Sequence, residues 1–197
     1  MKKLLLIFLL ILIGCSESEP INMETMLFER NGVWYTKDSN QPYSGPVFSL
    51  LNGILSQEVV LKDGEFHGLW KTYHENGKLK LEVTIKDGKE DGTYKRYTDK
   101  GKLWKEGTYK DGKLDGLFKE YWYGQRQVSQ EGTYKDGKKD GLWKFFNIYG
   151  QVFNEETYED GKEIGSKYYS FDNNGQLERE SFYKDGKLKT EIIYKRY

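Results

Sequence analysis

Between residues 78 and 85 the chain alternates strictly, with an apolar side chain at every second position and a charged residue or threonine between. A period of two predicts a β-strand with one buried face. Asp-Gly pairs punctuate this pattern at regular intervals of 24 or 25 residues. They lie at 63–64, 87–88, 111–112, 136–137, 160–161 and 185–186. A fixed period of this length indicates an array of repeats.

Each repeat carries two further turn signals. A second glycine follows the Asp-Gly pair by four residues, and a third turn signal such as Asn76-Gly77 falls later in the unit. Asp-Gly and Asn-Gly favour tight hairpin turns, because both central positions of a type I′ turn need positive φ. Each unit is therefore predicted to be a strand, a turn, a second strand and a tight loop. The sequence predicts an all-β fold: an elongated array of about six β-hairpin repeats of 24–25 residues, over residues 27–197.

Two ring positions, three residues apart, recur in the first strand of each unit. The first series is Trp70, Tyr94, Phe118, Trp143 and Tyr168, and the second is Tyr73, Tyr97, Tyr121, Phe146 and Phe171. On an ideal strand, positions three apart point to opposite faces. Either a bulge brings the two series together, or one of them is exposed.

An array of repeats needs distinct ends, because each unit buries its face against its neighbours. Residues 28–61 resemble a degenerate first repeat. The alternation over residues 188–194 predicts a closing strand, and the Lys195-Arg196 pair that follows it gives a charged edge that discourages further pairing.

The N-terminus is a short cationic start followed by an unbroken apolar run of ten residues, Leu4 to Ile13. A bilayer-spanning helix needs about 20 residues, so this run instead predicts a secretory signal. Leu12-Ile13-Gly14-Cys15 resembles the lipobox of bacterial prolipoproteins. That resemblance implies cleavage before Cys15 and acylation of its thiol, which gives a signal peptide over 1–14 and an acylated cysteine with a flexible tether over 15–26. A residue other than Asp after the cysteine fits outer-membrane sorting.

Composition excludes several classes of protein. The chain has 31 basic and 31 acidic residues, which argues against nucleic-acid binding. Two His and one Cys provide no zinc-ligand set and no disulfide. No nucleophile stands beside either histidine, and no cofactor motif occurs. The aspartates of the Asp-Gly pairs form a column that is explained by turn chemistry better than by calcium. We expect no enzyme activity, no metal and no cofactor.

The unit over residues 68–92, with Gly68-Leu69-Trp70-Lys71, Asn76-Gly77 and Asp87-Gly88, resembles the bacterial MORN repeat variant, and similar units recur at 92–97 and 141–144. The resemblance covers residues 27–197. It implies a module for membrane contact or protein scaffolding. Some bacterial chains of this type carry an antitoxin label, which leaves a toxin-neutralising partner protein as the alternative function.

The candidate binding residues form two ladders. The rings are Trp70, Tyr94, Phe118, Trp143 and Tyr168, and the lysines are Lys71, Lys95, Lys119 and Lys144. Rings at this spacing serve either as core or as a recognition strip, and lysines either cover rings on a solvated face or form a basic stripe. The expected partners are the membrane, through the lipid anchor, and another protein or cell-envelope component. The expected location is the bacterial cell envelope.

Overall fold

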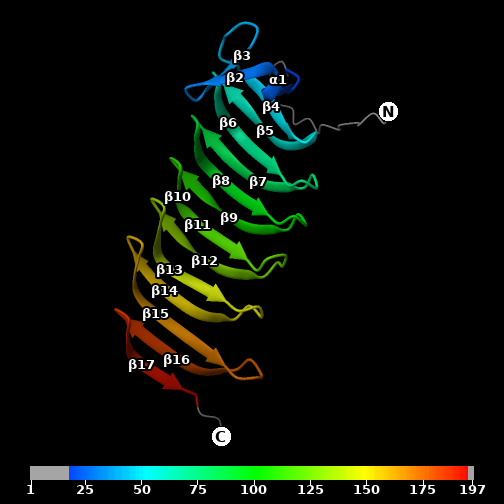
Figure 1. The fold of residues 1–197 in the computed structure, drawn as a ribbon. Coiled ribbons are helices and arrows are strands. Elements are labelled where there is room, and N and C mark those ends of the chain that lie inside the picture. Colours follow the sequence, from blue (N-terminus) through cyan, green and yellow to red (C-terminus); the bar gives the residue numbers. More distant parts are fainter. Residues whose placement is uncertain (1–17, 195–197) are drawn as a thin grey trace.

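The computed structural model describes residues 18–194, and most of their strands form one long sheet that is antiparallel from β4 onward. Strands lie side by side in sequence order, so that the two ends of the described chain lie at opposite ends of the sheet (Figure 1). The predicted signal peptide, residues 1–14, and the predicted acylation site, Cys15, lie outside the described residues.

The N-terminal elements precede the repeats. They are β1 (Ile21–Asn22), α1 (Met23–Met26), β2 (Leu27–Arg30) and β3 (Val33–Thr36). Six hairpins and one last strand then build the sheet. Their strands are β4 (Gly45–Leu51), β5 (Ile54–Lys62), β6 (Glu65–Tyr73), β7 (Leu79–Lys86), β8 (Lys89–Tyr97), β9 (Leu103–Lys110), β10 (Lys113–Leu114), β11 (Gly116–Tyr121), β12 (Val128–Lys135), β13 (Lys138–Phe146), β14 (Val152–Glu159), β15 (Lys162–Phe171), β16 (Leu177–Lys184) and β17 (Lys187–Ile193). The all-β repeat array is confirmed.

The Asp-Gly pairs make the tight turns that their composition predicts. Asp63 and Gly64 both have positive φ, 52° and 83°, and the other five Asp-Gly pairs repeat this conformation. The amide of Gly112 also donates to the carbonyl oxygen of Glu90, one hairpin earlier, at 2.8 Å. Equivalent bonds at the neighbouring turns join the hairpins along one edge of the array.

The turns at the opposite edge are longer than the sequence predicted. Only the glycine of Asn76-Gly77 has positive φ, and the loop closes through a bond from the His74 amide to the Lys78 carbonyl oxygen. The Asn76 side-chain amide donates to the Asp99 carbonyl oxygen of the next loop, at 2.7 Å. Both edges of the array are therefore cross-linked by hydrogen bonds.

A β-bulge lies next to the second ring position in every repeat. The register with the following strand shifts between Thr72 and Tyr73, and it shifts at the equivalent point in the other four repeats. The bulge does not bring the two ring series together, because Tyr73 donates its hydroxyl to Glu58, the residue paired with Lys71. Trp70 instead stacks on Phe66, with ring centroids 5.7 Å apart. The two series thus point to opposite faces of the sheet.

The face that carries Trp70, Tyr94, Phe118 and Trp143 is named the ring face. Rings of neighbouring strands pack against one another along it, for example Tyr134 against Trp143 at 5.0 Å and Phe118 against Tyr134 at 5.4 Å. The Trp143 indole is fully buried, and its Nε1 donates to the Thr133 carbonyl oxygen. The ring face is the core of the repeats.

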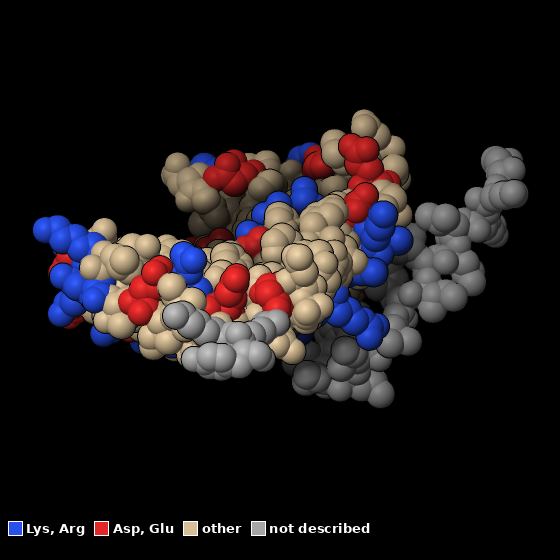
Figure 2. Space-filling view, turned by 90° about the horizontal axis from the view of Figure 1, so that it is seen from below, with Lys and Arg blue, Asp and Glu red and all other residues tan. Residues whose placement is uncertain are grey.

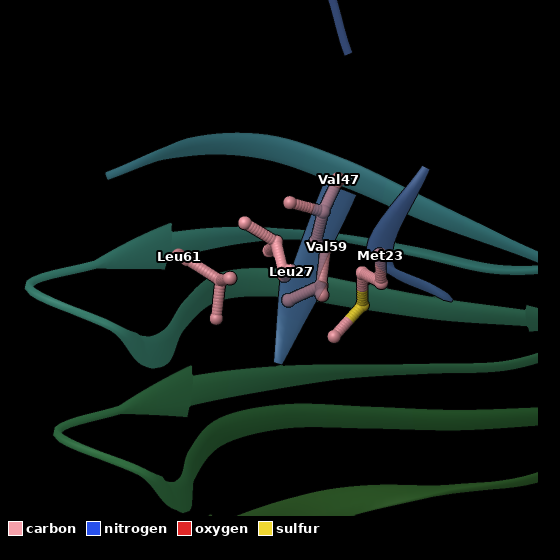
Figure 3. Close-up of a cluster of buried hydrophobic side chains, with 5 residues drawn as sticks. All are labelled: Met23, Leu27, Val47, Val59 and Leu61. Atoms are coloured by element: carbon pink, nitrogen blue, oxygen red, sulfur yellow. The ribbon is translucent and has the colours of Figure 1, made fainter. Parts of the chain in front are cut away.

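The N-terminal elements cover the ring face at the first hairpins. Met23 and Leu27 pack with Val47, Val59 and Leu61 in a buried cluster (Figure 3), and Trp34, Phe66 and Trp70 pack around it. Strand β1 also pairs in parallel with β4 and closes that edge of the sheet.

Two sequence predictions need correction here. The predicted tether, residues 15–26, is too long, because Ile21–Met26 are ordered and Met23 is only 2% exposed. Residues 28–61 do not form one repeat, because β2 and β3 pair only with each other as a separate two-stranded sheet and only β4 and β5 form a hairpin of the main sheet.

Candidate binding face

The face opposite the ring face is named the charged face, because an alternating ladder of glutamates and lysines runs along it. Each ladder residue is the register partner of the next, from β5 to β15. The ladder is Glu58, Lys71, Glu82, Lys95, Glu106, Lys119, Glu131, Lys144, Glu155 and Lys167. Figure 2, which views the molecule from the end at β17, shows acidic and basic side chains interspersed over that surface as well.

The ion pairs of this ladder are partly exposed. Lys71 Nζ lies 3.2 Å from Glu58 Oε1, and Lys119 Nζ lies 3.4 Å from Glu131 Oε2. Pairs of such exposure contribute about 0–1 kcal/mol each. The lysines can therefore exchange their intramolecular carboxylates for those of a partner at small cost.

A row of tyrosines supports the glutamates. Tyr97 and Tyr121 donate their hydroxyls to Glu82 and Glu106, at 3.1 and 2.6 Å. Burial, followed by this hydrogen bond, raises the pKa of Tyr97 to about 12. The same contact recurs from Tyr73, Tyr169 and Tyr194 to Glu58, Glu155 and Glu180.

One repeat lacks this support. Phe146 stands where the other repeats have the hydroxyl, so Glu131 receives no tyrosine bond and is held only by its ion pair with Lys119. Lys144, beside it, makes no ion pair within residues 18–194.

A third row on the charged face is apolar and threonine-rich. Leu69, Leu117 and Leu142 pair with Thr84, Thr133 and Thr157, respectively. The leucines are 44%, 71% and 49% exposed. Each stands two residues before a ladder lysine, so it shares that lysine's face. A shallow hollow of about 280 Å³ lies between Leu117 and Leu142, with Lys119, Lys144, Glu131 and Thr133 in its lining.

The structure separates the two predicted ladders. Rings and lysines are sequence neighbours, as in Trp70-Lys71, and therefore point to opposite faces. Phe118 is 7% and Trp143 0% exposed, so these rings belong to the core and cannot contact a partner directly. Lys71, Lys95, Lys119 and Lys144 lie together on the charged face.

Tyr168 keeps the register of the ring series toward the following strand, because it pairs with Ser181 as Trp70 pairs with Val83, each four residues before an Asp-Gly pair. Its register toward the preceding strand differs from that of the other rings. The other four rings directly precede a ladder lysine, whereas Tyr168 follows Lys167 and pairs with Asn154, as Phe145 does. Ser166 is the residue of β15 that lies across β14 from Trp143, because the two pair with Glu156 from opposite sides. The ring of Tyr168 lies one pair further along the ring face and is 42% exposed.

The glutamates of the ladder were not predicted as candidate binding residues. They recur at the repeat period, at residues 58, 82, 106, 131, 155 and 180, which would have revealed the ladder. Their register with the lysines depends on the bulges, which the period does not encode.

Residues 18–194 contain neither a cluster of metal-ligating side chains nor a helix that could span a membrane. No three His, Cys, Asp or Glu side chains in this part gather where they could hold a metal ion. None of its helices has the length and apolarity needed to cross a membrane.

Two solved structures show a weak likeness, and no curated protein matches the chain. One is a mutant TarM from S. aureus in complex with fondaparinux, alpha-GlcNAc-glycerol and UDP, 15% identical with a TM-score of 0.27, over 64% of this chain and 19% of that chain. The other is TarM, 14% identical with a TM-score of 0.26, over 68% and 20%. The chain spans about a fifth of the length of these structures, and such scores support no argument about it.

The family model described as the MORN repeat variant matches this chain at residues 66–87, 90–111, 166–185 and 178–196. The first two matches each take in one hairpin, β6–β7 and β8–β9, and the last two cover most of β15 to β17. These four stretches of the chain therefore match the MORN repeat variant, a kind of repeat that commonly mediates binding or scaffolding.

Proposed function

We propose that this protein is a non-catalytic binding scaffold of the bacterial cell envelope, anchored by lipid at Cys15, whose charged face contacts a protein or envelope component. The observation that carries the proposal is that the two faces of the sheet differ: one is packed as the core and the other is exposed. Rings on the ring face pack against one another and hold the hairpins together. On the charged face, the Glu–Lys ladder, the tyrosine row and the leucine–threonine row recur from repeat to repeat, and no other segment of residues 18–194 covers them.

The chemistry of the charged face suits a protein partner. Exposed leucines at regular spacing offer apolar contacts, and the weakly held lysines and glutamates offer ion pairs of both signs. Repeat arrays use such extended surfaces for recognition. The hollow between Leu117 and Leu142 is lined by Lys144, which makes no ion pair within residues 18–194, and is the expected centre of contact.

The lipid anchor rests on the sequence alone. Several acyl chains, each contributing about 0.8 kcal/mol per buried CH₂, hold a folded domain stably at a membrane. Because the first strand, β1, begins at Ile21, only residues 16–20 separate Cys15 from the sheet.

The binding part is tested by photo-crosslinking in a bacterial host that produces the full chain. A photoreactive residue replaces Leu117 or Leu142 on the charged face, and Tyr149 serves as the matched control because it is 81% exposed but lies in a loop. The proposal predicts one discrete crosslinked species from positions 117 and 142 that position 149 does not give. Equal crosslinking from all three positions, or none from the first two, contradicts it.

The anchor is tested separately in the same host. Cys15→Ser is expected to abolish incorporation of labelled fatty acid and to move the protein from the membrane fraction to the soluble fraction. Retention of the variant at the membrane with unchanged labelling rejects acylation at Cys15.

A further inference from the structure

The two ends of the main sheet differ in how they are closed. At the N-terminal end, β4 pairs with β1 and packs against the buried cluster around Met23. At the other end, β17 pairs with β16 alone, and no strand within residues 18–194 covers its outer edge. All seven residues of β17 are exposed. An open edge presents unpaired backbone N–H and C=O groups to any further strand.

The outer edge of β17 has the regular form that accepts a strand. Its equivalents in earlier repeats are bulged toward the preceding strand, whereas their pairing with the following strand is regular up to the bulge at the second ring position. Strand β8 shows this, with a register shift against β7 and an unbroken register from Gly92 to Arg96 against β9. In β17 the shift toward β16 occurs between Leu188 and Thr190, which leaves the segment from Lys189 onward regular on its outer side.

The sequence of β17 is complementary to itself. Two copies paired antiparallel about a twofold axis through Thr190 place Lys189 of one copy opposite Glu191 of the other, twice. The same register puts Leu188 opposite Ile192, whose side chains are 51% and 47% exposed. Shifting the axis to Glu191, the next residue, would set two glutamates face to face. Opposite charges and apolar pairs across strands stabilise a sheet, and like charges destabilise it.

We propose that β17 pairs with β17 of a second copy of this chain, antiparallel and centred on Thr190, so that two arrays join into one continuous sheet. The added strand takes the place that the next hairpin strand has everywhere else in the array, because neighbouring repeat strands are antiparallel throughout. Such a twofold contact is isologous and closes, so it yields a dimer rather than a fibre. The Lys195-Arg196 pair, which the sequence analysis expected to discourage pairing, lies outside the described residues.

The first test uses charge swaps and analytical ultracentrifugation of the full chain in a mild detergent. Glu191→Lys creates two like-charged pairs and is expected to raise the dimer dissociation constant about tenfold. The double variant Lys189→Glu/Glu191→Lys restores opposite charges and is expected to restore dimerisation. Glu191 also contacts Arg179 at 3.5 Å, but this contact is lost in both variants, so recovery in the double variant isolates the contact between copies.

The second test fixes the register. In a Cys15→Ser background, Thr190→Cys is expected to give a disulfide-linked dimer on mild oxidation, because the two Thr190 residues oppose each other. Thr157→Cys is the matched control, since Thr157 is also exposed but lies in the interior strand β14. A monomeric full chain at all concentrations, a dimer indifferent to both charge variants, or equal crosslinking from position 157 overturns the proposal.

Discussion

Trp143 packs directly onto the backbone of Gly132 in the neighbouring strand β12. A Cβ atom added to Gly132 would lie under 3.0 Å from the indole, closer than real Cβ contacts allow. Gly132 does not have positive φ, so its lack of a side chain matters for space rather than for backbone conformation. The fully buried ring of Trp143 therefore requires that residue 132, on the neighbouring strand, has no side chain.

Gly132→Ala is expected to destabilise the protein by about 2–3 kcal/mol, because the overpacked indole is displaced. Gly165→Ala is the matched control: its nearest contact is the Tyr183 carbonyl oxygen, at 3.4 Å, and it also lacks positive φ. Urea unfolding followed by tryptophan fluorescence compares the two. Equal midpoints for both variants would show that the indole does not need the space.

The tyrosine–glutamate bonds predict alkaline sensitivity. The folded-state pKa of Tyr97 is raised to about 12, chiefly by burial and then by its bond to Glu82, whereas an unfolded tyrosine ionises near pH 10. The stabilisation is fully present below about pH 10 and is lost as pH rises toward the folded-state value, because the unfolded chain releases its proton first. Unfolding free energies measured across this window should fall with pH, and the fall should be smaller in Tyr97→Phe. An unchanged slope in that variant is the contrary result.

The missing hydroxyl at Phe146 can be supplied. Phe146→Tyr is expected to give Glu131 the donor that Tyr121 gives Glu106, and to stabilise the protein by about 0.5–1 kcal/mol. The reverse change at the equivalent position, Tyr121→Phe, is expected to cost a similar amount. Thermal unfolding by calorimetry measures both, and a destabilising Phe146→Tyr would mean that the repeats do not share this geometry.

The N-terminal cap predicts a sharp contrast within α1. Met23 is 2% and Met26 is 51% exposed, on the same four-residue helix. Met23→Ala is expected to cost about 2–4 kcal/mol of stability, and Met26→Ala close to nothing. Chemical unfolding of the two variants checks this. Similar small losses of stability from both variants would indicate that residues 21–26 form a tether and not a packed cap.

The sequence predicted the repeats because Asp-Gly fixes the turn chemistry locally at each of six sites. The cap escaped prediction because Met23 and Leu27 closely follow an acidic, proline-containing segment and show no periodicity that would mark them as buried. The altered register of Tyr168 toward β14 escaped prediction for another reason. Repeat spacing locates turns, whereas the register of β15 follows from its pairing with β14, which sets Lys167 opposite Glu155. Which face a ring occupies likewise depended on pairing across strands.

The central claim, that one face holds the array together while the other is free for a partner, is tested most directly by the adjacent residues Leu142 and Trp143. Trp143 is fully buried on the ring face and Leu142 is 49% exposed on the charged face. Denaturant unfolding should show a loss of about 3–5 kcal/mol for Trp143→Ala and a change within about 0.5 kcal/mol for Leu142→Ala. Comparable losses from the two substitutions would contradict the division of the sheet into a core face and a binding face.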